Sequence, residues 1–167
     1  MSLALIRELF GYHGWAMRRA FDMGASLSAD QWGRVVISDR SARRILTHVT
    51  NSERMWPHYW RRAQPPPRLR EEDSLDAGAL RATWEEAHRE TLAFVNGLTE
   101  ADLVRDVDYT FPGGARYVRS LQRLLLHLIH HAGYHRGELA AVVGGLGKPV
   151  LECDLTFYYI DCWGNGV

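Results

Sequence analysis

The segment from Leu121 to Val143 constrains the chain most, because it places many histidines in a pattern typical of one long helix. It contains half of the chain's eight histidines. At about 100° per residue, His127, His131 and His135 fall on one helix face. Burying an unpartnered imidazole costs about 1–3 kcal/mol, whereas neutral imidazole is a good ligand for a divalent metal. The pattern favours a metal site over the alternative, hydrogen bonds to carbonyl or carboxylate groups.

Two of these histidines have the spacing of a ligand pair. His131 and His135 are one helical turn apart, so both can reach one ion. A catalytic site usually has three protein ligands and an open position, and the third must come from another helix. His48 is the best candidate because it lies mid-helix on an inner stripe, and His13 is the runner-up. Three histidines spaced four residues apart diverge along a straight helix, so we expect His127 to lie beside the ligands or to be packed among other side chains rather than to bind the metal.

Two known metal motifs are absent. A zinc peptidase needs His-Glu-x-x-His, but the segment here is His131-Ala-Gly-Tyr-His135. A di-iron bundle needs Glu-x-x-His on two helices, and that spacing occurs once, ending at His88 in a charged stretch that suggests surface. We therefore expect neither enzyme, and we expect His88 to be exposed.

Apolar periodicity predicts four long amphipathic helices, over 3–23, 41–62, 75–96 and 118–145. Ser28 with Gln31, and Thr99 with Asp102, fit capping boxes of short turns. Residues 107–114 indicate an extended loop or small hairpin, and Asp154 suits the N-cap of a short C-terminal helix. We expect an all-α fold, a four-helix bundle in a single domain over 1–167.

Composition limits the possible partners and compartment. Lys+Arg and Asp+Glu are equal at 20 each, and this balance argues against nucleic-acid binding. Two cysteines without a CxxC motif fit a reduced cytosolic protein. No apolar run approaches the ~20 residues of a membrane span. We expect a bacterial cytoplasmic protein that acts on a small molecule, and we predict a homodimer because helical bundles often form one.

Several segments together resemble the DinB family of bacterial damage-inducible proteins, which is related to the YfiT-like metal-dependent hydrolases. His135-Arg-Gly137 is the specific part of the match, which covers nearly the whole chain. The segments that carry the resemblance are 12–16, Leu46-Thr-His-Val-Thr-Asn-Ser-Glu-Arg-Met-Trp56, His127-Leu-Ile-His-His-Ala-Gly-Tyr-His-Arg-Gly-Glu-Leu139, 147–154 and 157–159.

This resemblance implies a bundle in up-down-down-up order, with a long crossover that fits Pro65–Asp73. It also implies a metal, zinc or nickel, held by His48, His131 and His135, in agreement with the choice from spacing. Glu138 stands where the family often has glutamine. The related enzymes use a low-molecular-weight thiol as cofactor.

We therefore expect a metal-dependent enzyme that acts on small molecules, as a thiol S-transferase or isomerase, or as a hydrolase. The alternative is a non-catalytic, stress-linked metal-binding bundle that acts by dimerisation or ligand binding. No nucleophile or general base is evident. Candidates for positions around the metal or in the pocket are His127, His13, Glu138, Trp56 and Tyr134.

Overall fold

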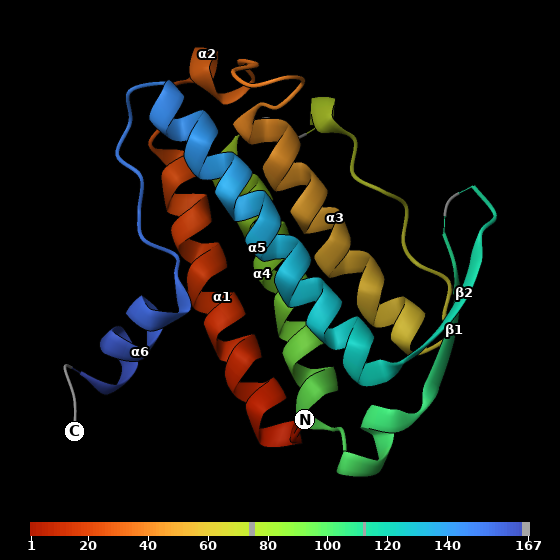
Figure 1. The fold of residues 1–167 in the computed structure, drawn as a ribbon. Helices are drawn as coiled ribbons and strands as arrows, with labels where there is room; N and C mark the ends of the chain where they lie inside the picture. Colours follow the sequence, from red (N-terminus) through yellow and green to blue (C-terminus); the bar gives the residue numbers. More distant parts are fainter. Residues whose placement is uncertain (74–75, 112, 165–167) are drawn as a thin grey trace.

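The computed structural model describes residues 1–73, 76–111 and 113–164, and this part is mostly helical with one small sheet. Four long helices lie side by side (Figure 1). Their bounds are Leu3–Ala25 for α1, Ala42–Trp60 for α3, Ala77–Asn96 for α4 and Leu121–Gly145 for α5. The shorter elements are α2 (Ala29–Trp32), η1 (Glu71–Asp73), η2 (Glu100–Val104), β1 (Asp106–Thr110), β2 (Arg116–Ser120) and α6 (Leu155–Trp163).

Side-chain caps set most of the helix starts. Ser41 caps α3 and Asp76 caps α4, each by accepting a backbone N–H of the first turn. Both predicted capping boxes are confirmed, at α2 and at η2. Asp154 caps α6 as predicted, so the tail forms a helix rather than a strand. Leu75, where the sequence places the start of the third long helix, lies outside the described residues.

Two predicted helix ends are wrong, for identifiable reasons. Gly24 follows the predicted range 3–23 and is of the residue type typical of helix ends, but it does not terminate α1, which continues to Ala25 and has Ser26 as its C-cap. A Cβ on Gly24 would lie 2.7 Å from Leu46 Cδ1, so glycine is needed there for close packing of α1 on α3. The fourth long helix begins at Leu121 rather than near Val118, because 116–120 pair with β1 in an antiparallel hairpin.

The interior is divided between two hydrophobic clusters. One contains Phe21 and Trp84, and the other contains Phe10 and Trp60. His13, itself buried, has its ring 6.1 Å from that of Phe10 and 6.0 Å from that of Trp84, so it contacts both clusters. The long helices thus surround a polar group at the centre of the protein as well as an apolar core.

Candidate metal centre

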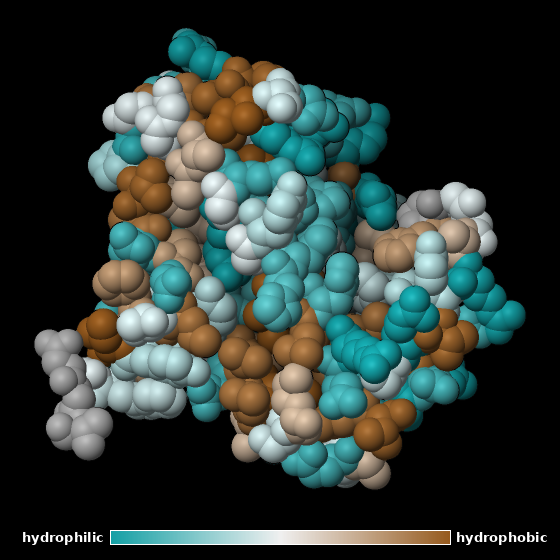
Figure 2. Space-filling view, in the orientation of Figure 1, coloured by the Kyte–Doolittle hydropathy of each residue, from teal (hydrophilic) through white to brown (hydrophobic). Residues whose placement is uncertain are grey.

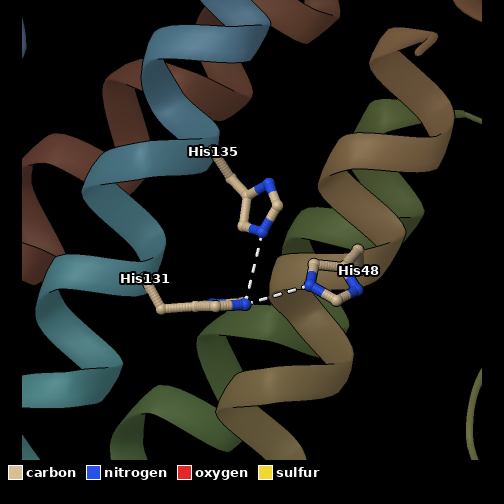
Figure 3. A group of neighbouring side chains, drawn as sticks. All are labelled: His48, His131 and His135. Carbon is tan, nitrogen blue, oxygen red and sulfur yellow. Dashed lines mark hydrogen bonds between the residues drawn. The ribbon is translucent and has the colours of Figure 1, made fainter. Parts of the chain in front are cut away.

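Three imidazoles from two helices point toward one another (Figure 3). His48 belongs to α3, and His131 and His135 belong to successive turns of α5. His131 Nε2 lies 3.0 Å from His48 Nε2 and 3.2 Å from His135 Nε2. One nitrogen of each ring lies within 4.8 Å of the others, so the group could hold a metal ion.

The donor set fits a divalent cation such as zinc. Zn–N bonds of about 2.0–2.1 Å in a tetrahedron place two ligand nitrogens about 3.3 Å apart, close to the separations of 3.0 and 3.2 Å found here. A single proton on His131 Nε2 can be donated to only one of its two neighbours at a time. A cation at the centre would satisfy all three nitrogens at once.

The orientation of His135 is fixed by a carboxylate. His135 Nδ1 lies 2.6 Å from Glu138 Oε2, so Nδ1 carries the proton and donates it, leaving the Nε2 lone pair toward the other two histidines. Glu138 Oε1 in turn lies 3.2 Å from Arg40 Nε. Metal-binding histidines usually donate their second ring N–H to a carboxylate or carbonyl that holds the ring in place. Here Arg40 in turn holds the carboxylate of Glu138.

Burial keeps the rings of His48 and His131 neutral at physiological pH. Burial, followed by the neighbouring His135, lowers the pKa of His48 to about 4. The same two causes lower the pKa of His131 to about 3. Neutral imidazole is the form that binds metal, so protons compete with the metal only in acid.

A cavity of about 200 Å³ opens beside this group, and His48 and His131 form part of its wall. Two of the predicted pocket residues, Trp56 and His127, also line it, and the centres of their rings lie 4.9 Å apart. Tyr134 packs edge-on to His135 but is 66% exposed, and it lines a different pocket with Arg40. The cavity thus joins His48 and His131 to an aromatic wall.

His13 does not join this centre but belongs to a second, fully buried group with Glu53 and His88, which could also hold a metal ion. His13 Nε2 lies 2.8 Å from Glu53 Oε2, and His88 Nδ1 lies 2.9 Å from Glu53 Oε1. These are hydrogen-bond distances, with one imidazole donating to each carboxylate oxygen. The expectation that His88 is exposed is therefore wrong, because this contact and its stacking on Trp84 bury it.

The buried carboxylate of Glu53 stays ionised. Desolvation raises its pKa, but the charge and hydrogen bonds of His13 and His88 together lower the pKa well below the usual range. Burial lowers the pKa of His13 and Glu53 partly offsets this, while the ring donates to the carboxylate through Nε2. The group acts as a buried polar link between α1, α3 and α4.

Sequence reasoning missed several residues near the three imidazoles, among them Arg40, Arg68 and Phe111. Arg40 precedes α3 and reaches Glu138 on α5, a contact between segments about a hundred residues apart. Phe111 follows β1 and lines the cavity beside Trp56. The predicted loop or hairpin over 107–114 was the only sequence signal that pointed to Phe111, and Pro112 of that segment lies outside the described residues.

Comparisons with known proteins place the chain in a family. No helix in the described ranges is both long and apolar enough to cross a bilayer. No curated protein matches the chain. The model of the DinB family matches residues 1–161, nearly the full length, and so the chain belongs to the DinB family.

Proposed function

We propose that this protein is a metal-dependent enzyme that acts on small molecules, with a divalent metal held by His48, His131 and His135. The observation that carries the proposal is the convergence of three Nε2 atoms beside a cavity. Within the described residues, no further His, Cys, Asp or Glu joins this group. Structural zinc sites usually have four protein ligands, whereas catalytic sites leave one position open.

The protein's own residues would prepare such a site. Glu138 holds the ring of His135 with Nε2 facing inward, and burial keeps His48 and His131 unprotonated. Trp56 presents an apolar wall that would exclude water from one side of a bound molecule. A bound metal would supply a Lewis acid that lowers the pKa of water to about 7 or holds a thiolate.

For the reaction we propose transfer or isomerisation with a low-molecular-weight thiol, with hydrolysis of a small substrate as the second possibility. Zinc and nickel both suit three imidazoles. The support is family membership together with a neutral, all-nitrogen donor set that leaves room for an anionic ligand. A non-catalytic bundle that acts by dimerisation alone would leave the adjoining cavity unused.

A panel of thiols and model electrophiles tests this function directly. We expect zinc- or nickel-loaded protein to accelerate conjugation of at least one thiol, and the variant His135→Ala to lose the acceleration. The variant His130→Ala changes an exposed histidine of the same helix and serves as control. Metal binding without turnover of any thiol or ester would support the non-catalytic alternative.

Glu138 provides a separate prediction about affinity. The substitution Glu138→Gln should weaken metal binding by about 10–100-fold, because the amide supports the His135 ring less strongly than a carboxylate. Competition with a chromophoric chelator measures this change. The matched control is Glu90→Gln on α4, since Glu90 is exposed. Equal affinities for Glu138→Gln and wild type would show that the hydrogen bond at 2.6 Å does not tune the site.

We also propose that the four long helices form a bundle in up-down-down-up order. The support is the path of residues 61–73, which lead from the end of α3 back toward the end of the helices at which α4 starts (Figure 1). A single domain, a homodimer and a location in the bacterial cytoplasm stay predictions. Size-exclusion chromatography with light scattering measures the oligomeric state.

A further inference from the structure

The cavity beside the three imidazoles continues into a larger cleft of about 1140 Å³. Met55, Tyr59, Arg68 and Phe111 line both spaces, so the two spaces adjoin. The space-filling view shows hydrophilic surface over the middle of α5 and hydrophobic surface near the lower ends of α1 and α5 (Figure 2). A ligand at the imidazoles can therefore extend toward Arg68 and Phe111 without leaving the site.

The wall of this site is aromatic. The rings of Trp56 and Phe111 lie 6.2 Å apart at 87°, and those of Trp56 and Tyr59 lie 5.6 Å apart at 73°. Such edge-to-face contacts hold the rings in place and leave flat apolar surface toward the cavity. Binding pockets generally combine a wall of this kind with a few polar groups that fix the ligand's orientation.

Arg68 is the group here that lacks a partner. Among the described residues it forms no ion pair and no hydrogen bond, and it lines the same cavity as His48 and His131. Its neighbours in the cleft are already engaged: Arg62 donates to the Asp106 carbonyl, and the carboxylate of Asp108 is paired with Arg116. Arg68 is exposed and lines both the cleft and the cavity of His48 and His131, so its charge is open to a ligand in either space.

We infer that the ligand is a small organic anion that bears a carboxylate, with the carboxylate bound by Arg68. Its apolar body would lie against Trp56 and Phe111, and a donor atom such as a thiolate would bind the metal. A guanidinium binds a carboxylate in two-pronged fashion and discriminates against a neutral amide of the same shape. The binding of the ligand's donor atom to a metal rests on the proposed function. The binding of its carboxylate by Arg68 rests only on the residues that line the cleft.

The test uses two thiols that differ only in charge, para-mercaptophenylacetate and its primary amide. Binding to cobalt-loaded protein is followed by the thiolate-to-cobalt charge-transfer absorption. Wild type should bind the acid about tenfold more tightly than the amide, a difference expected of a charge-assisted pair. Arg68→Met should abolish this preference and leave affinity for the amide unchanged. Arg61→Met is the matched control, because Arg61 is exposed and contacts Glu90 and Phe94 instead.

A metal-free arm separates the two proposals. Para-tolylacetate and its amide are titrated into metal-free protein, with binding followed by nuclear magnetic resonance, and the acid should again be preferred in an Arg68-dependent way. If neither thiol produces the charge-transfer band but this preference persists, the thiol function fails and the anion site stands. The charge-transfer band can also appear without an Arg68-dependent preference for the acid, either because Arg68→Met keeps the wild-type preference or because wild type shows no preference. In that case the anion site is refuted while the metal function stands.

Discussion

Replacing Glu53 with alanine is expected to lower the free energy of unfolding by about 3–5 kcal/mol, because it removes one partner of a buried charged group. The side chain is 1% exposed and accepts from His13 and His88 at 2.8 and 2.9 Å. Without it, two buried imidazole N–H groups lose their acceptor. Chemical denaturation measures the change. A loss below about 1 kcal/mol would mean that the three residues contribute little to stability.

Two further variants show where the effect arises. Glu53→Gln keeps an acceptor for one imidazole but loses the charge, so its free energy of unfolding should fall between those of wild type and Glu53→Ala. Glu86→Ala on α4 is the control, because Glu86 is exposed. Its unfolding free energy should stay within about 0.5 kcal/mol of wild type.

The same residue should shape the dependence of stability on pH. The folded-state pKa of Glu53 lies below its ordinary value of 4.5, so the unfolded chain takes up the proton first as pH falls. The stability that Glu53 contributes is therefore present above that value and is lost below it. His13, with a pKa lowered from 6.5, begins to lose its contribution below about pH 6.5. Each group adds at most about 1.4 kcal/mol per pH unit.

Denaturation of metal-free wild type and Glu53→Ala across the range from neutral to about pH 4 isolates this effect, since His48 and His131 are common to both. The wild-type curve should fall more steeply in acid than that of the variant. Parallel curves would show that folding does not lower the pKa of this carboxylate.

Helix positions followed from the sequence, whereas their exact ends depended on tertiary contacts. Apolar stripes and capping residues act locally, which is why Ser28, Thr99 and Asp154 cap as predicted. Gly24 looked like a helix stop, but its role is to let Leu46 approach, and no local pattern reveals a neighbour from another helix. Val118 likewise belongs to a strand whose partner is ten residues earlier.

The environment of the histidines was predictable only in part. Helical spacing places His131 and His135 on one face, and the structure brings His48 from α3 against them. The location of His88 was not predictable, since the charged residues around it suggest a surface and its partner, Glu53, lies 35 residues earlier. Arg40 and Arg68 are outside any helix, so periodicity says nothing about where their side chains lie.

The largest effect of all should come from removing a proposed metal ligand. Untagged wild-type protein should bind close to one equivalent of zinc or nickel, while His48→Ala, His131→Ala and His135→Ala should each lose about 100-fold or more in affinity. This exceeds the 10–100-fold cost of losing a residue that only supports a ligand. At a metal concentration about a thousand times the Kd, binding adds about 4 kcal/mol to wild type, which raises Tm by about 8–16 °C for a chain of this size.

The outcome also decides between the two histidine groups. The variant His130→Ala removes an exposed histidine from the same helix, so it should still bind the metal and show the rise in Tm. If His13→Ala lost the metal instead, while the three ligand variants kept it, the buried group with Glu53 would be the metal site. Two equivalents would mean that both groups bind. We expect one, because the carboxylate oxygens of Glu53 already accept an imidazole N–H each, whereas His48, His131 and His135 share a centre that protons alone cannot satisfy.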